Sequence, residues 1–243
     1  MEKERFTVGI EDDVTHLSLA PIYGAVEKDP GMTACKFWGL GSDGTVGANK
    51  NSVNIINTGT NKYAQAYFEY DAKKSFGVTR SHLKFSDKPI RGSYLVNEAD
   101  FVACHNQAFI LSYDIVGDLK EGGNFLLNTS WDVEAMSKVL PAKVRRTLAE
   151  KKINFYTIDA THIAEELKLG SHINIILQSA FFAIAKVIPM EESVEYIKKA
   201  IKKTYFTKGD DVINQNIAAI DRGISDLKKI DIPVEWVNAQ DEE

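Results

Sequence analysis

A glycine-rich run at residues 39–45 has the residue types and spacing to hold a phosphate group. Gly39, Gly41 and Gly44 form a Gly-x-Gly-x-x-Gly pattern, and Ser42 and Thr45 add hydroxyl groups to it. Glycine lets the backbone turn tightly and approach a ligand, and the start of a helix offers free N–H groups with a partial positive charge. We therefore expect a phosphate-binding loop here, provided that a strand precedes the run and a helix follows it.

Two lysines farther along the chain can complete a site for a phosphorylated nucleotide. Asp71 ends the apolar segment 64–70, and Lys73 and Lys74 follow it. In dinucleotide-binding folds an acidic residue at this place contacts ribose hydroxyls, and a nearby cation contacts a ribose phosphate. Asp71 lies farther from the last glycine than the usual distance of about 20 residues, which disfavours a standard nicotinamide fingerprint. NADP and coenzyme A both stay open as ligands, as does a solvated surface role for both lysines.

The segments around the loop predict an α/β fold. A strand at 34–38, a helix at 45–56 and a strand at 64–70 follow one another in βαβ order. Further elements follow, with strands at 77–85, 100–104, 124–128 and 153–158, and helices at 107–119, after Pro141 and after Asp159 or Thr161. This alternation indicates a mostly parallel, Rossmann-like sheet flanked by helices.

The last third of the domain is expected to be helical. At 173–188 apolar residues recur at helical spacing on a wide face, which predicts a deeply buried packing helix. Two amphipathic helices at 193–205 and 210–229 would cover the sheet. Asn174 and Asn216 are polar residues within these helices, and the ordinary reading of each is a cap or a solvated side chain.

Three parts are expected along the chain. Residues 1–33 lead in from a preceding domain, 34–230 form the α/β domain, and 231–243 form a linker.

Composition argues against several classes of protein. The net charge is −5, which disfavours a general nucleic-acid surface, and no apolar run approaches the roughly 20 residues of a membrane span. The N-terminus lacks the apolar stretch of a signal peptide, so a cytoplasmic location is expected. Cys35 and Cys104 are the only cysteines, both within predicted strands, and the five histidines have no metal-binding spacing. We expect two buried thiols and no metal site.

Three long strings are more specific than spacing alone. They occupy residues 6–15, 36–51 and 63–75, and the second reads Lys-Phe-Trp-Gly-Leu-Gly-Ser-Asp-Gly-Thr-Val-Gly-Ala-Asn-Lys-Asn. Shorter strings follow at 81–85, 99–106, 158–160 and 203–209, together with Ile173-Asn174, Gln178 and Phe181-Phe182. In these strings the chain resembles the pyruvate:ferredoxin (flavodoxin) oxidoreductase family over nearly its whole length. The matching part is an internal domain, equivalent to the separate γ subunit of related 2-oxoacid oxidoreductases.

The resemblance implies oxidative decarboxylation of pyruvate to acetyl-CoA with reduction of ferredoxin or flavodoxin. Thiamine diphosphate and 4Fe-4S clusters would lie outside this chain, which is not expected to be active alone, and the full-length enzyme would be a homodimer. The role left for this domain is to bind coenzyme A. The expected contacts come from the loop residues Gly41, Ser42, Asp43, Gly44 and Thr45, and from Lys74, Asn174 and Asn216.

Two positions depart from the family pattern beside the expected site. The chain has His172 where the family usually has arginine before Ile-Asn, and Phe76 where it usually has glycine. A histidine is only partly charged near neutral pH, so phosphate binding can be weaker or pH-dependent. Two other interpretations stay open: an independent NADP-binding reductase, for which no Tyr-x-x-x-Lys pair stands out, and a structural assembly module without a ligand.

Overall fold

The computed structural model describes residues 4–20, 31–72, 77–92 and 95–241, and the chain divides into two compact units, 1–30 and 31–243. In the first unit, Thr7 and Ser18 form a parallel bridge. The carboxylate of Asp13 accepts a hydrogen bond of 3.1 Å from the N–H of Thr15.

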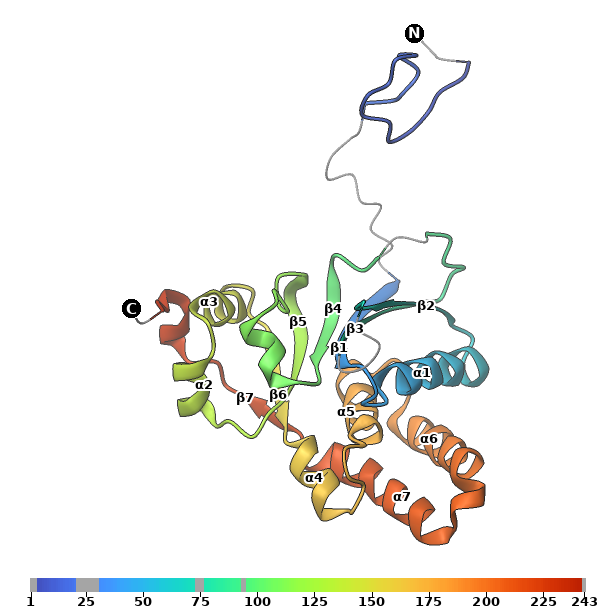
Figure 1. Cartoon of the computed structure of the whole chain (residues 1–243), viewed down its shortest axis with the longest axis vertical. Helices are drawn as coiled ribbons and strands as arrows, with labels where there is room; N and C mark the ends of the chain where they lie inside the picture. Colours follow the sequence, from blue (N-terminus) through green and yellow to red (C-terminus); the bar gives the residue numbers. More distant parts are fainter. Residues whose placement is uncertain (1–3, 21–30, 73–76, 93–94, 242–243) are drawn as a thin grey trace. The chain divides into compact units, whose positions relative to one another are not determined.

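The second unit is built on one seven-stranded sheet (Figure 1). Its strands lie in the order β2-β3-β1-β4-β5-β6-β7. Neighbours from β1 through β4 and β5 to β6 pair in parallel, whereas β3 and β7 pair antiparallel with their neighbours. The bounds are β1 (Met32–Leu40), β2 (Tyr63–Tyr70), β3 (Val78–Ser86), β4 (Ala99–Cys104), β5 (Leu119–Asn128), β6 (Asn154–Ile158) and β7 (Lys228–Ile230). The expected α/β class with a mostly parallel sheet is confirmed.

The placement of β3 is the main difference from a simple βαβ unit. Strand β3 pairs with both β1 and β2, so it lies between the two strands that the sequence pattern joins through a helix. At its other edge β1 pairs with β4. Strand β1 therefore has an antiparallel neighbour on one side and a parallel neighbour on the other.

Helices cover both faces of the sheet. Helices α1, α4, α5, α6 and α7 contribute to one apolar cluster, and α2, α3, η1 and η3 contribute to the other. Figure 1 shows the same division. The bounds are α1 (Thr45–Gly59), η1 (Gln107–Leu111), α2 (Val133–Val139), α3 (Ala142–Glu150), α4 (Ala160–Glu166), α5 (Asn174–Ala185), α6 (Met190–Tyr205), η2 (Phe206–Lys208), α7 (Asp210–Ser225) and η3 (Val234–Asn238).

Helix α5 is the buried packing helix that the apolar pattern predicts. The ring of Phe181 lies 5.1 Å from the rings of both Phe37 and Phe101, measured between centroids. Gly223 allows α7 to approach closely, because a Cβ atom there would lie 2.4 Å from the carbonyl oxygen of Ile176. Helix α7 therefore packs closely on α5.

Two predicted helices are shorter than expected. The helix expected at 107–119 is only the 3-10 helix η1, and β5 already begins at Leu119. Between η1 and β5 the side chain of Asp114 accepts a hydrogen bond from the N–H of Gly117. The helix expected at 210–229 ends at Ser225, and the following residues pair with β6 as β7.

Residues 231–241, where we expected a linker, pack on the second unit. Trp236 in η3 is only 1% exposed, and its Nε1 donates a hydrogen bond of 3.0 Å to the Ser137 hydroxyl on α2. The side chain of Asp241 accepts a hydrogen bond of 2.6 Å from the N–H of Ala142. The segment therefore contributes to the core on the α2 and α3 face.

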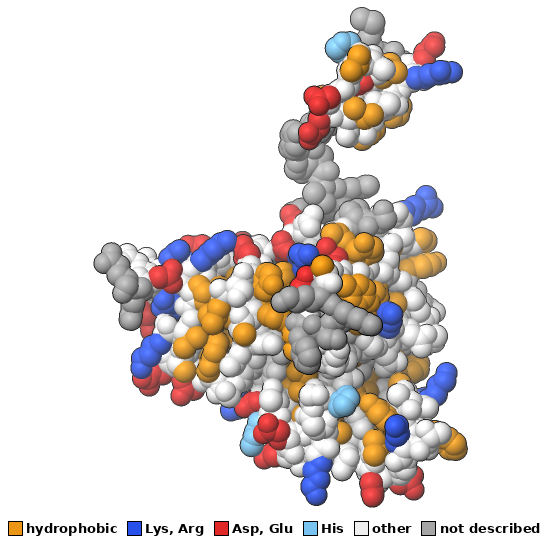
Figure 2. All heavy atoms as spheres, in the orientation of Figure 1, with side chains coloured by type: hydrophobic (Ala, Val, Ile, Leu, Met, Phe, Trp, Pro, Cys, Tyr) orange, Lys and Arg blue, Asp and Glu red, His pale blue; other side chains and the backbone are white. Residues whose placement is uncertain are grey.

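On the face of the second unit that Figure 2 shows, Lys and Arg side chains lie among Asp and Glu side chains. Within the described ranges, no helix has the length and apolar content needed to cross a membrane.

Candidate functional site

The glycine-rich loop joins β1 to α1, as the sequence predicts. Ser42 and Gly44 have φ angles of 80° and 87°, and the N–H of Gly41 donates to the carbonyl of Gly77 at 2.7 Å. Gly39 is required by a close approach, because a Cβ atom there would lie 2.7 Å from the Thr45 side chain. The backbone of the run therefore depends on glycine at both ends.

Asp43 holds the loop together through its carboxylate. One oxygen accepts from the N–H of Leu40 at 2.8 Å, and the other accepts from the N–H of Thr45 at 2.7 Å. These two N–H groups are thus already bonded. Within the described part of the chain, the N–H groups of Ser42, Gly44 and Val46 have no such partner. These three groups remain able to bind an anion at the start of α1.

Asn174 lies against the loop. A Cβ atom on Gly44 would be 2.9 Å from Cγ of Asn174, the first residue of α5. Helix α5 is in turn bound to α1, because the buried Gln178 side chain donates to the Ala48 carbonyl at 3.1 Å and to the Ser52 hydroxyl at 2.9 Å. The starts of the two helices are therefore held next to each other.

His105, directly after β4, contacts the same loop from the sheet. Its Nδ1 lies 2.7 Å from the hydroxyl oxygen of Thr45, and both side chains are buried. Its Nε2 is buried and has no hydrogen-bond partner among the described residues. Burial lowers the pKa of His105 to about 4, although the nearby Asp43 carboxylate favours the charged form. The imidazole is therefore neutral at pH 7.

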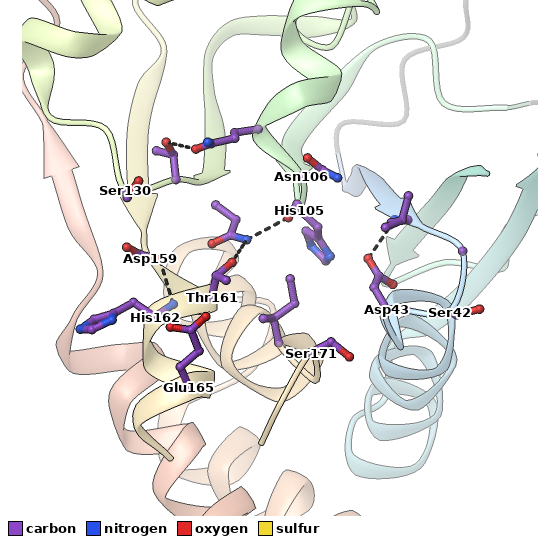
Figure 3. Close-up of a pocket in the computed structure, with 16 residues that line it drawn as sticks. Ser42, Asp43, His105, Asn106, Ser130, Asp159, Thr161, His162, Glu165 and Ser171 are labelled. Carbon is purple, nitrogen blue, oxygen red and sulfur yellow. Dashed lines mark hydrogen bonds between the residues drawn. The ribbon is translucent and has the colours of Figure 1, made fainter. Parts of the chain in front are cut away.

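A cavity of about 600 Å³ opens at the carboxyl ends of β1, β4, β5 and β6 (Figure 3). In parallel α/β sheets this edge is the usual place for ligands. The lining residues are Leu40, Gly41, Ser42, Asp43, His105, Asn106, Gln107, Asn128, Thr129, Ser130, Asp159, Thr161, His162, Glu165, Ser171 and Ile173.

Asn128 connects the strand ends beneath the cavity. Its Nδ2 donates to the His105 carbonyl at 2.9 Å, and its Oδ1 accepts from the N–H of Ala160 at 2.9 Å. Of the two caps expected for α4, Asp159 is the one observed, and its side chain accepts from the N–H of His162 at 3.0 Å. The cavity floor is thus fixed by hydrogen bonds between β4, β5 and α4.

The charges around the cavity are acidic. Asp43, Asp159 and Glu165 are among the described residues that line it, and no Lys or Arg is. A phosphate group deep in the cavity would be repelled by these carboxylates, and no lysine or arginine among the described lining residues would offset the repulsion. Ser42 lines the cavity and also belongs to the anion site at the start of α1, so the anion site adjoins the acidic part of the cavity.

The structure brings together most, but not all, of the residues expected at the site. Gly41, Ser42 and Asp43 line the cavity, Gly44 contacts Asn174, and the Thr45 hydroxyl is next to His105. Lys74 and its neighbour Lys73 lie outside the described residues.

Asn216 does not line the cavity. It is buried on α7, and its Nδ2 donates to the Val212 carbonyl at 2.8 Å within the helix. Its assignment to the site stays a prediction.

His105 and Asn128 are the site residues that the sequence analysis missed. Each stands at the carboxyl end of a predicted strand, and this position of a polar residue is a signal that could have identified them. Cys104, the neighbour of His105, is buried, and burial raises its pKa to about 12. Cys35 is buried too, as expected. Across the described ranges, no group of three or more His, Cys, Asp or Glu residues is placed to hold a metal ion.

Several known proteins are similar in sequence to this chain. The family model described as "Pyruvate ferredoxin/flavodoxin oxidoreductase" matches residues 34–225. The pyruvate:ferredoxin oxidoreductase of Moorella thermoacetica is 54% identical over 241 residues, which are 99% of this chain and 20% of that protein. The pyruvate-flavodoxin oxidoreductase of Enterobacter agglomerans is 48% identical over 240 residues, 98% of this chain and 20% of that protein. The chain thus spans about a fifth of the length of these relatives.

Two solved structures share the fold. The pyruvate oxidoreductase subunit PORC of Thermotoga maritima has a TM-score of 0.65 at 24% identity, covering 83% of this chain and 99% of that one. The 2-oxoglutarate:ferredoxin oxidoreductase of Magnetococcus marinus, solved with 2-oxoglutarate, coenzyme A and succinyl-CoA, has a TM-score of 0.59 at 16% identity. That match covers 79% of this chain and 30% of the other.

Proposed function

This chain belongs to the pyruvate ferredoxin/flavodoxin oxidoreductase family, and we propose that it is the domain of such an enzyme that binds coenzyme A. The complete enzyme would convert pyruvate and coenzyme A to acetyl-CoA and carbon dioxide, and would pass the electrons to ferredoxin or flavodoxin. The domain would hold coenzyme A for the acetyl transfer that neighbouring domains carry out.

The observation that carries this proposal is the contact between the loop and the start of α5. Gly44 and Asn174 touch, and the N–H groups of Ser42, Gly44 and Val46 have no partner within the described ranges. Backbone N–H groups at the start of a helix bind phosphate oxygens, and a neighbouring side-chain amide can add a hydrogen bond. The pyrophosphate of coenzyme A is the group we assign to this place.

Three further side chains complete the proposed site. Lys74 would contact a phosphate as a point charge. Asn216 would contribute its Oδ1, since its Nδ2 is already bonded to Val212. His172, exposed just before α5, stands where the family usually has arginine. The guanidinium that an arginine would offer to a phosphate is therefore missing at this position.

The other cofactors of such an enzyme would lie in other domains. Cys35 and Cys104 are buried in separate apolar clusters, and a 4Fe-4S cluster needs about four cysteine ligands. We place thiamine diphosphate outside this chain as well. Coenzyme A is therefore the one ligand proposed here, with the neighbouring domains and a second copy of the full enzyme as partners in a cytoplasmic homodimer.

Isothermal titration of the 243-residue chain tests the proposal. Coenzyme A, dephospho-coenzyme A, NADP and NAD are compared for the wild type, for Lys74→Ala and for the control Lys62→Ala. Lys62 pairs with Asp87 on the surface. Selective binding of coenzyme A that Lys74→Ala weakens by roughly 1.5 to 3 kcal/mol is expected for a charged hydrogen bond to phosphate. The control should bind like the wild type.

Other outcomes of the titration would contradict the proposal. Tighter binding of NADP than of coenzyme A would favour a reductase. Absence of binding by a folded sample would favour a structural module.

A further inference from the structure

The two edges of the seven-stranded sheet differ in how they are protected. At one end, β7 has only three residues, and two of them are the lysines Lys228 and Lys229. At the other end, β2 has eight residues, contains no proline and pairs with β3 without a bulge. Short length, charge, proline and bulges are the features that keep an edge strand from pairing with another strand. Strand β7 has two of these features, whereas the only charged residue within β2 is Glu69.

Strand β2 directs some of its backbone groups away from the sheet. The N–H of Asp71 donates to the Val78 carbonyl at 3.0 Å, and in an antiparallel pair only every second residue is bonded to the neighbouring strand. The outward residues of β2 are therefore Ala64, Ala66, Phe68 and Tyr70. Asn57 on α1 binds the first of them, because its Oδ1 accepts from the N–H of Ala64 at 2.9 Å. The N–H groups of the other three have no partner among the described residues.

We propose that β2 pairs antiparallel with β2 of a second copy of this chain, about a two-fold axis at Phe68. In this register Phe68 lies opposite Phe68 of the second copy, and Ala66 lies opposite Tyr70. All of these residues are outward ones, so each opposed pair exchanges two backbone hydrogen bonds. Ala64 would face a residue beyond the end of β2, and its N–H is the one that Asn57 already binds. No described residue of β2 lines the cavity, so the pairing is independent of coenzyme A binding.

The side chains on the face of β2 away from α1 fit this register. Tyr67 would lie opposite Glu69 of the second copy, in the kind of opposed pair whose side chains are closest. Oε2 of Glu69 contacts His82 at 2.7 Å and Arg80 at 3.3 Å within its own copy, which leaves Oε1 to accept from the tyrosine hydroxyl. The two-fold axis makes this contact twice. Tyr67 is 56% exposed in the single chain, and tyrosine is enriched at protein interfaces.

Other symmetric registers of the same two strands are less favourable. An axis nearer the start of β2 would place Ala64, which Asn57 already binds, opposite an open residue. An axis nearer the end of β2 would place Glu69 opposite Glu69 or Asp71 of the second copy, and like charges directly opposite destabilise a pair of strands. The axis at Phe68 uses all three open residues and avoids both conflicts. Figure 1 shows β2 at the outer end of the sheet, next to α1.

Sedimentation equilibrium of the 243-residue chain tests the pairing. We expect the wild type to form a dimer. Tyr67→Glu and Tyr67→Lys both remove the ring, but they place a like charge and an opposite charge, respectively, across from Glu69. Tyr67→Glu should therefore dimerise about 10-fold more weakly than Tyr67→Lys. Tyr63→Glu is the matched control, since Tyr63 is 48% exposed at the start of β2 but lies outside the paired residues, and it should dimerise like the wild type.

A disulfide across the axis tests the register directly. Opposed residues of a hydrogen-bonded antiparallel pair have Cα atoms about 5.5 Å apart, which a disulfide can span. Mild oxidation should link Phe68→Cys chains into covalent dimers and leave Tyr63→Cys chains unlinked on a non-reducing gel. The native Cys35 and Cys104 are buried and should not contribute.

Three outcomes would overturn the proposed pairing. A wild type that stays monomeric at every concentration would assign the open edge to a strand of another protein. A dimer that Tyr67→Glu and Tyr67→Lys affect equally would use a different surface or register. Linking of Tyr63→Cys as readily as Phe68→Cys would exclude the axis at Phe68.

Discussion

Gly44 and Asn174 come from distant parts of the sequence and touch at the start of two helices. A Cβ atom on Gly44 would lie 2.9 Å from Cγ of Asn174, and the φ angle of Gly44 is 87°. The glycine is therefore needed twice, for its own backbone angle and for the approach of α5. This contact joins the phosphate-type loop to the helical part of the domain.

The first prediction concerns this contact. Gly44→Ala should lower the free energy of unfolding by about 2 kcal/mol, because alanine is strained at positive φ and its Cβ would collide with Asn174. Gly47→Ala is the matched control, since a Cβ atom there has no neighbour within 4 Å. This control lies inside α1 and should gain roughly 0.5 to 1 kcal/mol. Urea unfolding of both variants tests the difference, and equal effects would argue against the close approach.

The second prediction is a loss of stability in acid that His105 causes. Its pKa is lowered to about 4 in the folded protein, by burial, whereas an unfolded histidine has a pKa of 6.5. Between these values the unfolded state binds more protons, so the stabilisation present above pH 6.5 is lost as the pH falls towards 4. The full loss is on the order of 3 kcal/mol.

The variant His105→Phe shows how much of the pH dependence of stability comes from His105 and how much from other titrating groups. His82 also has a lowered pKa because of burial, so the variant should keep part of the pH dependence. Urea unfolding of the wild type and of His105→Phe at about pH 7.5 and about pH 4.5 measures the slope of the free energy of unfolding against pH for each protein. An unchanged slope in the variant would show that His105 is not buried in its neutral form.

The third prediction concerns a buried lysine in β1. Nζ of Lys36 lies 2.5 Å from the Asp118 carboxylate and 5.4 Å from the centre of the Trp38 ring. Asp118→Ala should lower the free energy of unfolding by about 3 kcal/mol, the low end for a broken buried pair, because the Asp118 side chain is 31% exposed. Thermal unfolding tests this value. Lys36→Met combined with Asp118→Ala should be less destabilised than Asp118→Ala alone, since no unpaired charge then remains buried.

The fourth prediction tests the packing of the C-terminal segment. Trp236→Ala should lower the free energy of unfolding by about 3 to 5 kcal/mol, because a large buried ring is lost. Val234 is 86% exposed in the same 3-10 helix, and Val234→Ala should change stability by less than about 0.5 kcal/mol. Denaturant unfolding distinguishes the two. Similar small effects would mean that residues 231–241 act as the linker that the sequence suggested.

The sequence by itself determined the elements that depend only on residues close together in the chain. The glycines at 39–45 predict the loop because positive φ angles and close approaches are properties of single positions. Helical spacing of apolar residues predicts α5, and Asp159 or Thr161 predicts the start of α4. The long strings at 36–51 and 63–75 were sufficient to identify the family.

The tertiary structure decided which elements are neighbours. Only the pairing of β3 with both β1 and β2 separates the two strands that α1 connects, and no local pattern encodes that pairing. The contact of His105 with Thr45 likewise depends on β4 lying beside β1. Strand neighbours are selected by the burial of whole sheet faces, so the cavity and its unpartnered Nε2 emerge only when the complete sheet has formed.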